Sequence, residues 1–394
     1  MTAIAVLLAV ISGAVSLIWS SRHLKIRRER KHGFVLTGDY AGPGDKPPLV
    51  SVVVAAKDEE ACIDTCIRTM LSQDYPNFEM IVCNDRSTDR TAQIVSGLCE
   101  EDTRLRLVNI DHLPEGWCGK NNAMQTGIST ANGEWICMID ADCRQLSNRT
   151  ISVAVQYAID NHIDMLSVLP ILEMKGLWEN AIQPVCSGVM MIWYDPDKVN
   201  NPKCRPAYAN GAFILISREA YMKIGTHEAV RDKVNEDMHM ADITKKAGLK
   251  LRVVRSQGLY MVRMYTSLRS ILLGWSRIFY GTFGTLGRLI ASFALMFCMG
   301  VVPYISAALG LAAYFAGAGT AWLVTGLLGL AAVVMQVSVI GRFYKLIKAK
   351  PLYCLTYWLG CLITLYAIIL SISKLRKGAK LVWRNTSYAV TTKN

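Results

Sequence analysis

Acidic side chains follow three predicted strands of this chain, at the point where each strand ends. Because the carboxyl ends of parallel strands meet at one edge of a sheet, we expect these acids to lie close together. Like charges gathered in this way repel unless a cation joins them, and carboxylate oxygens suit Mg²⁺ or Mn²⁺, which also take phosphate oxygens. One such cluster alone could be an ordinary polar loop, but three together favour a site for a metal and a phosphate ligand. The strands and the acids that follow them are Leu49–Ala55 with Asp58 and Glu59, Met80–Cys83 with Asp85, and Trp135–Ile139 with Asp140 and Asp142.

Predicted helices alternate with these strands. Helices are expected at residues 60–72, Ala92–Leu98 and Asn121–Thr130, with a further strand at Leu105–Ile110. Alternation of this kind predicts an α/β domain with a mostly parallel sheet, and residues 48–265 are long enough for one such domain.

Charge is divided unevenly along the 394 residues, whose formal net charge is +12. Residues 1–242 hold all 31 acids and carry a net −7, whereas residues 243–394 hold 19 bases and no acid. Most of those bases alternate with long apolar runs, as in a membrane anchor with cationic flanks. A nucleic-acid partner is therefore not expected.

Apolar segments predict membrane anchors at both ends. Residues 1–21 suit one crossing with the N-terminus outside, although a buried soluble helix is the alternative, and the basic linker 22–47 would then face the cytoplasm. Residues 288–374 suit about three crossings, and a basic tail, 375–394, follows. Basic loops flank the last apolar segment on both sides, so either that segment is re-entrant, or the tail lies outside, or the division into crossings is wrong. We expect an integral protein of the cell (inner) membrane with its catalytic domain and tail in the cytoplasm.

An amphipathic pattern precedes the C-terminal anchors. Apolar residues recur at helical spacing from Leu268 to Phe283, with Arg269 and Arg277 between them. The pattern predicts an interfacial helix within residues 266–287, and a continuation of the soluble core is the alternative.

The order of these motifs resembles the family 2 glycosyltransferases with the GT-A fold, over about residues 48–280. The chain looks closest to the membrane-bound subgroup that acts on lipids, which includes hopanoid-associated, carotenoid and ceramide-type transferases. Two further patterns are similar to that subgroup but imperfect, since Thr226 and Asn385 replace glycines. The matching residues are Val50–Glu59, Asn84–Asp89, Gly116–Lys120, Asp140–Asp142, Ala209–Gly211 and Asn235–Asp237, with Ile224–His227 and Trp383–Tyr388 as the imperfect pair.

The resemblance implies a role for each candidate residue. Asp237 would be the catalytic base that takes the acceptor proton, with Glu236 in support. Asp140 and Asp142 would bind the donor and its Mg²⁺ or Mn²⁺, Asp142 more directly. Independently of the resemblance, Lys120 lies just before a predicted helix, where lysines and helix N-termini favour phosphate, so it is a candidate for the donor phosphates; a solvated lysine is the alternative. The remaining donor-side candidates are Ala56, Asp58, Glu59 and Asp85, and the acceptor-side candidates are Asn210, His227, Trp275 and Arg277.

One difference from the family's motifs argues against a processive polymer synthase. Processive polymer synthases carry Gln-x-x-Arg-Trp after the base, whereas this chain has Ile271-Leu272-Leu273-Gly274-Trp275. The pattern favours an inverting transfer of a sugar from a nucleotide sugar, UDP-hexose first among them, to a membrane lipid. The alternatives are a polyprenyl-phosphate sugar synthase, a polysaccharide synthase of the same family, and a non-catalytic membrane adaptor.

Overall fold

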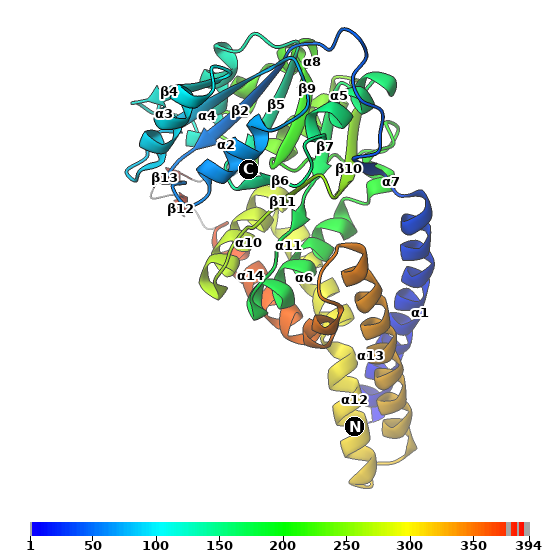
Figure 1. Cartoon of the computed structure of the whole chain (residues 1–394). Helices are drawn as coiled ribbons and strands as arrows, with labels where there is room; N and C mark the ends of the chain where they lie inside the picture. The colour runs from blue at the N-terminus through cyan, green and yellow to red at the C-terminus, as the bar shows by residue number, and fades with distance from the viewer. Residues whose placement is uncertain (1, 376–379, 384–385, 390–394) are drawn as a thin grey trace.

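The computed structural model describes residues 2–375, 380–383 and 386–389, and joins one α/β domain to a group of long helices (Figure 1). An eight-stranded sheet forms the centre of the domain, in the order β1-β10-β7-β9-β5-β2-β3-β4. Its neighbouring strands are parallel except for β9, which runs antiparallel to both β5 and β7. The strands are β1 (Val35–Thr37), β2 (Val50–Ala56), β3 (Phe78–Asp85), β4 (Leu105–Ile110), β5 (Trp135–Asp140), β7 (Met165–Leu169), β9 (Phe213–Ser217) and β10 (Leu251–Gln257).

Helices cover both faces of this sheet because its strands are buried on both sides. Val52 and Val54 of β2 point into one core and Val53 into the other, and none of the three is exposed. The first core receives α2 (Ile63–Leu71), α3 (Thr91–Glu101) and α5 (Thr150–Asp160). The second receives α4 (Gly119–Ser129), α8 (Arg218–Lys223), the 3₁₀ helix η1 (His227–Val230) and α9 (Glu236–Lys246). The expected mostly parallel α/β fold is confirmed.

A smaller sheet and two further helices lie between the large sheet and the long helices. The sheet contains β6 (Cys143–Gln145), β11 (Tyr260–Val262) and β8 (Ile171–Leu172). The helices are α6 (Leu177–Trp193) and the short α7 (Pro196–Val199).

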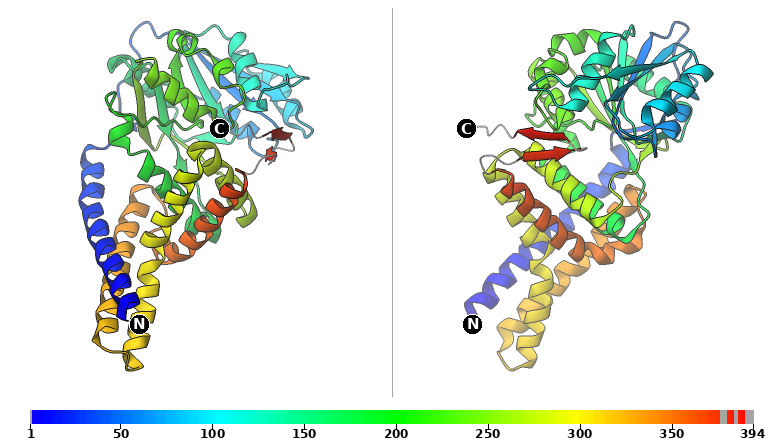
Figure 2. Two further views of the ribbon diagram at one scale, coloured as in Figure 1. Left: turned by 180° about the vertical axis from the view of Figure 1, so that it is seen from behind. Right: turned by 90° about the vertical axis from the view of Figure 1, so that its left-hand side faces the viewer.

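The long helices include the expected anchors (Figure 2). Three helices of the described residues are long and apolar enough to cross a membrane, and the pair α11–α12, bent by 41°, is a fourth candidate span. The helix expected from the amphipathic pattern begins at Leu268 and ends at Phe283, as predicted. These elements are α1 (Thr2–His32), α10 (Leu268–Phe283), α11 (Leu286–Gly300), α12 (Val302–Phe315), α13 (Thr320–Leu346), the 3₁₀ helix η2 (Pro351–Thr356) and α14 (Tyr357–Ser373), followed by the hairpin β12 (Lys380–Trp383) and β13 (Thr386–Ala389).

The expected linker 22–47 is partly regular structure, which corrects that prediction. Helix α1 continues to His32, and Val35–Thr37 then pairs in parallel with β10 at the edge of the large sheet. The reason lies in two apolar residues. Leu36 is buried in the core, and the Phe34 ring packs under the Arg252 guanidinium at 4.9 Å.

Candidate active site

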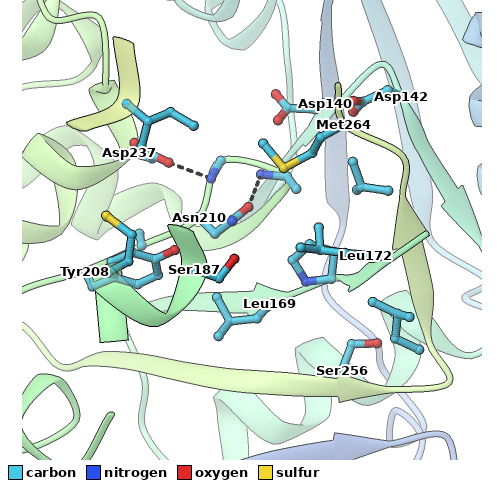
Figure 3. Close-up of a pocket in the computed structure, with 18 of the residues that line it drawn as sticks. Asp140, Asp142, Leu169, Leu172, Ser187, Tyr208, Asn210, Asp237, Ser256 and Met264 are labelled. Atoms are coloured by element: carbon cyan, nitrogen blue, oxygen red, sulfur yellow. Dashed lines mark hydrogen bonds between the residues drawn. The ribbon is translucent and has the colours of Figure 1, made fainter. Parts of the chain in front are cut away.

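A cavity of about 1690 Å³ opens at the carboxyl ends of β2, β3 and β5 and extends to the ends of the long helices. Figure 3 shows part of its wall, with Asp140 and Asp142 across from Asp237. Most of the residues singled out in the sequence meet here although they are far apart along the chain. Those that line the cavity are Ala56, Glu59, Asp85, Lys120, Asp140, Asp142, Asn210, Glu236, Asp237, Trp275 and Arg277.

Lys120 joins the two acidic parts of the cavity. It lies in the first turn of α4, and its Nζ is 2.7 Å from Asp140 Oδ1 and 2.7 Å from Glu236 Oε1. Burial lowers the pKa of Lys120, but these two carboxylates outweigh burial and hold the pKa well above its usual range. The ammonium group thus lies in the cavity wall between two carboxylates that favour its charged form.

Asn121 fixes that lysine relative to α9, a role that sequence reasoning missed. Its Nδ2 donates to three backbone carbonyls of the loop before α9, those of Val230 (2.7 Å), Arg231 (3.2 Å) and Lys233 (2.9 Å). The only signal for it in the sequence was its place beside Lys120. The contact holds the start of α4 against the segment that leads to Glu236 and Asp237.

Asp237 lies in the first turn of α9 and faces the turn that enters β9. The backbone N–H of Gly211 donates to its Oδ2 (2.8 Å), and the N–H of Met238 donates to its Oδ1 (2.7 Å). Burial and the neighbouring Glu236 carboxylate raise the pKa of Asp237 to about 7, although Lys120 and the two N–H groups act in the opposite direction. A carboxylate with a pKa near neutrality can accept a proton from a substrate at physiological pH.

Asp140, the last residue of β5, and Asp142, two residues beyond it, form the opposite wall. Burial raises the pKa of Asp142 to about 7, and the Asp140 and Glu59 carboxylates add to the effect. Asp142 Oδ1 is buried without a hydrogen-bond partner. A buried oxygen of this kind, in the electrostatic field of the Asp140 and Glu59 carboxylates, fits a divalent cation. No cluster of three or more metal-ligating side chains occurs among the residues that the structure describes, so phosphate oxygens and water would complete such a site.

Asp58 is not part of the cavity wall, contrary to expectation. Its backbone adopts a left-handed conformation with φ of 53°, and its Oδ1 accepts hydrogen bonds from the Thr88 N–H (2.7 Å) and Oγ1 (3.1 Å). Asp58 thus ties the loop after β2 to the loop after β3. Asp85 does reach the cavity, where it pairs with Arg86 at 2.8 Å.

His227 also lies outside the cavity, which corrects its expected place on the acceptor side. Only 1% of the residue is exposed, and its Nδ1 is 2.8 Å from the Tyr221 hydroxyl. Burial, with a smaller effect from Lys120, lowers the pKa of His227 to about 3. A neutral, enclosed imidazole of this kind packs η1 against α8.

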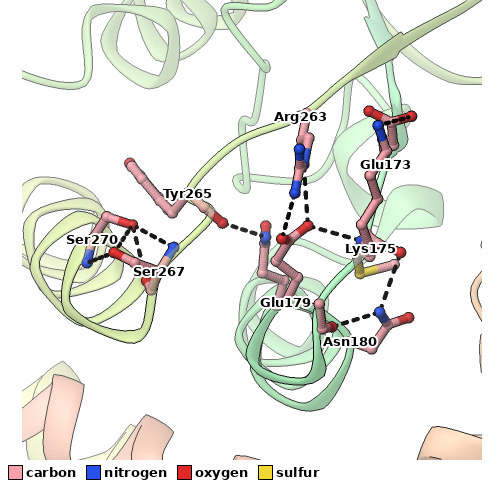
Figure 4. A network of polar contacts seen from close by, with 11 residues as sticks. Glu173, Lys175, Glu179, Asn180, Arg263, Tyr265, Ser267 and Ser270 are labelled. Atoms are coloured by element: carbon pink, nitrogen blue, oxygen red, sulfur yellow. Dashed lines mark hydrogen bonds and ion pairs between the residues drawn. The ribbon is translucent and has the colours of Figure 1, made fainter.

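The segment between β11 and α10 forms the cavity wall nearest the helices. Within this segment, Arg263 donates to Glu179 Oε1 (2.9 Å), and the Tyr265 carbonyl accepts a hydrogen bond from Gln183 Nε2 (3.2 Å). Because Glu179 and Gln183 belong to α6, that helix holds the segment in place (Figure 4). Burial alone would raise the pKa of Glu179, yet Arg263 and the Lys175 N–H hold it below its ordinary value. Arg277 from α10 reaches the Tyr265 hydroxyl at 3.2 Å. Trp275 and Arg277, which were expected on the acceptor side, both line the cavity, and Arg277 contacts this segment directly.

The far side of the cavity is made by the ends of helices. Ser187 and Met190 line it from α6, and Phe343 and Leu346 line it from the last turns of α13. Cationic side chains line the cavity on this side, next to Met190, Phe343 and Leu346. The acids that line the cavity lie at its other end, at the carboxyl ends of the strands and the start of α9. The cations on this side are Arg27, Arg255, Arg342, Lys345 and Lys348.

Comparisons with known proteins agree with this arrangement. The family model described as Glycosyl transferase family 2 matches residues 51–225. The probable glycosyltransferase YdaM of Bacillus subtilis (strain 168) is 36% identical over 114 residues, which are 28% of this chain and 26% of that protein. Beta-monoglucosyldiacylglycerol synthase of Nostoc sp. (strain PCC 7120) is 33% identical over 27% of this chain and 23% of its own length.

A longer but weaker match extends beyond the family model. The 4,4'-diaponeurosporenoate glycosyltransferase of Staphylococcus aureus (strain USA300) is 24% identical over 254 residues, which are 62% of this chain and 65% of that protein. The matched regions thus span from about a quarter to about two thirds of these relatives. Among solved structures, the mannosyltransferase PcManGT from Pyrobaculum calidifontis, in complex with GDP-Man and Mn²⁺, superposes with a TM-score of 0.51 at 18% identity. That match covers 95% of this chain and 98% of the other, and it shows a shared fold.

Proposed function

Because residues 51–225 match the family model described as Glycosyl transferase family 2, and the fold is shared with a solved mannosyltransferase, we propose that this chain transfers a sugar from a nucleotide sugar to a lipid of its own membrane. UDP-hexose is the first donor to test. The catalytic domain would face the cytoplasm of the cell (inner) membrane, because the bases that flank the apolar helices lie on its side.

One observation carries the proposal, namely that a single cavity reaches both the carboxylates and the long helices. The same space is lined by Asp140 and Asp237 and by Phe343 and Leu346 at the end of α13. A soluble acceptor would need no apolar approach from that side. A lipid needs one, because its hydroxyl or carboxyl must reach the sugar while its chain stays in the bilayer.

The charged residues of the cavity indicate how it would bind the donor. Asp140 and Asp142 would hold a Mg²⁺ or Mn²⁺ ion with the donor diphosphate, and the ion would supply neutralisation of the charge that builds on the leaving diphosphate. Lys120 would bind the same diphosphate directly, in exchange for its contact with Asp140. Asp85, Glu59 and the Ala56 backbone are close enough to the cavity to meet the nucleoside.

The acceptor side depends on Asp237. Its carboxylate would remove the proton of the acceptor hydroxyl while that oxygen attacks the anomeric carbon of the sugar. The new bond forms on the face opposite the leaving diphosphate, so one displacement inverts the anomeric centre. Glu236, held by Lys120, would support the base by keeping its pKa high.

The direct test is a transfer assay with purified protein, labelled nucleotide sugars and a lipid extract. We expect label in the lipid fraction with one donor, and none with Asp237→Asn. Asp242→Asn on the same helix is the matched control, because Asp242 pairs with Lys246 away from the cavity. Label in soluble polymer alone would contradict a lipid acceptor.

A second candidate is a synthase that charges a polyprenyl phosphate, and the cations on the helix side of the cavity favour it. Arg255, Arg342 and Lys345 would suit a lipid phosphate. A phosphate oxygen is ionised already and needs no strong base. Activity that survives in Asp237→Asn would therefore select this candidate over the first.

A further inference from the structure

We infer that α14 lies along the surface of the bilayer on the side of the catalytic domain and does not cross it. The inference rests on the membrane anchoring in the proposed function. By apolar length alone, residues Pro351–Ser373 could span a membrane. The contacts of α14 decide against that.

The end of the helix group that lies farthest from the catalytic domain contains the starts of α1 and α13. Thr325 Oγ1 near the start of α13 donates to the Ala5 carbonyl near the start of α1 (2.8 Å). The turn from Phe315 to Thr320 lies beyond that pair, away from the domain (Figure 1). A crossing helix that started at the domain would have to end at this level.

Neither end of α14 lies at that level. At its start, Tyr357 packs edge-on against Trp19, near the end of the apolar run of α1, with ring centroids 6.1 Å apart. At its end, Ser371 Oγ donates to the Ser276 carbonyl (2.8 Å), and Lys374 Nζ donates to Ser276 Oγ (2.6 Å). Ser276 lies on α10 between two residues that line the cavity, so the last turn of α14 is at the depth of the cavity wall.

The middle of α14 packs closely against α6 of the catalytic domain. Gly360 allows the approach, because a Cβ there would collide with the backbone of Ala181. Cys186 and Thr364 meet beside it at 3.3 Å. Figure 2 shows the helix passing beside α10, away from the direction of the α12–α13 hairpin. Its 17 residues extend about 25 Å, less than the roughly 30 Å of a bilayer core.

The opposite face of α14 is apolar and is only partly covered by the described residues. Its side chains recur at helical spacing and are about half exposed: Trp358 (45%), Leu362 (44%), Tyr366 (52%) and Ile369 (48%). Leu352 and Leu355 of η2 continue the same surface. Aromatic residues mixed with aliphatic ones, between Lys350 and Lys374, suit the interfacial layer of a bilayer. We therefore assign lipid as the occupant of this surface.

This placement accounts for the two basic loops that the sequence puts on either side of one apolar segment. If α14 does not cross, both loops face the side of the catalytic domain, as positive-inside logic requires. Three crossings remain, by α1, by α11 with α12, and by α13. The helix would also hold α10, and with it the cavity wall, at headgroup depth.

Protease sites inserted one at a time into the full chain test the topology. The positions are residues 42–45 in the catalytic domain, the turn at 317–319, and a point after Asn394. In inside-out membrane vesicles we expect cleavage at the first and third sites alike, and cleavage at the turn only after detergent is added. A C-terminal site that resists cleavage until detergent, while the 42–45 site is cut, would overturn the inference.

Failure of the anchoring gives a different pattern. Cleavage at both 42–45 and 317–319 in the same intact vesicles would show that the α12–α13 hairpin does not cross, which would contradict the membrane anchoring itself. Since the criterion compares the C-terminal site with the domain site, a reversed orientation of the whole protein leaves it unchanged.

Photolabelling measures the depth of the helix. Phospholipids that carry a diazirine near the headgroup should label peptide 357–373, whereas a diazirine at the acyl end should label α1 near Leu7 and Val10. Equal labelling of 357–373 by the deep probe would contradict an interfacial position.

Discussion

The backbone N–H of Gly211 lies 2.8 Å from Asp237 Oδ2 and donates a hydrogen bond to it. This contact links the turn before β9 to the first turn of α9, and so connects two segments that meet only in the folded chain. It also orients the carboxylate, because the second oxygen is held by the Met238 N–H at 2.7 Å. The proposed base is therefore fixed before any substrate arrives.

Replacing Gly211 by Ala should reduce transfer at least about tenfold. The added Cβ would lie 3.0 Å from Lys120 Nζ and 3.4 Å from Asp237 Oδ2, and Lys120 is already held by two carboxylates. Initial rates with the preferred donor measure the effect. Gly97→Ala is the control, because a Cβ there meets nothing within 4 Å. Equal rates in the two variants would refute a role for this close approach.

Asp237→Asn should lower kcat by about 100-fold or more, the size expected for removal of a general base. The variant should still fold. Folding raises the pKa of Asp237 from 3.8 to about 7, so its ionised form costs stability above that pH, and a neutral Asn avoids the cost. Thermal unfolding at pH 8 should therefore show no loss. A less stable protein at pH 8 would mean that the lost activity reflects folding.

Transfer should depend on pH in the direction set by the raised pKa of Asp237. The base works only when ionised, so kcat/KM of the free enzyme should fall about tenfold per unit below pH 7. An ordinary aspartate would keep the rate flat to about pH 5. Rates measured from pH 5 to pH 9 distinguish the two cases, and a flat profile would count against Asp237 as the base.

Removal of divalent metal should abolish donor binding. Asp142 has a buried oxygen without a partner in the field of the Asp140 and Glu59 carboxylates, and without a cation these acids would repel an anionic diphosphate. Calorimetry with the donor should show no heat in EDTA, and Mg²⁺ or Mn²⁺ should restore it. Asp142→Asn should raise the metal concentration needed at least about tenfold. Asp111→Asn, a matched change at the end of β4 outside the cavity, should not.

Asn121→Ala should destabilise the protein by about 2 kcal/mol, because buried carbonyls lose their donor. It should also weaken donor binding, since Lys120 and α9 would no longer be held together. Thermal unfolding in detergent and donor titrations measure the two effects. Asn132→Ala, on an exposed loop, is the control. A variant as stable as the control would show that the clamp contributes little.

The sequence predicted the elements whose patterns are strong. The apolar run before Asp140 and the periodicity of Leu268–Phe283 were sufficient, and both elements appear where expected. Strand β9 was not predicted at all, and an apolar run could not have shown its antiparallel direction. The three-residue strand β1 is too short for any period to detect.

Most residues of the candidate site were also predicted from the sequence. The residues that were placed wrongly or overlooked have physical explanations. Residue type identified the acids and Lys120, but type does not reveal where a side chain points. Asp58 turns toward Thr88 because its backbone is left-handed, and His227 is enclosed by Tyr221. Asn121 carried no charge that would draw notice. Hydropathy likewise could not distinguish a helix that crosses from one that packs on α6.

The pairing of β1 with β10 has a consequence for how enzyme and acceptor would meet. A domain on a loose tether would tumble above the bilayer and turn its opening away from the surface for much of the time. Here the sheet edge follows directly from α1, and Lys25 and Asp195 form an ion pair between that helix and the domain. The opening would then stay level with the lipids, and the acceptor would arrive by lateral diffusion in two dimensions, while the donor would arrive from solution in three.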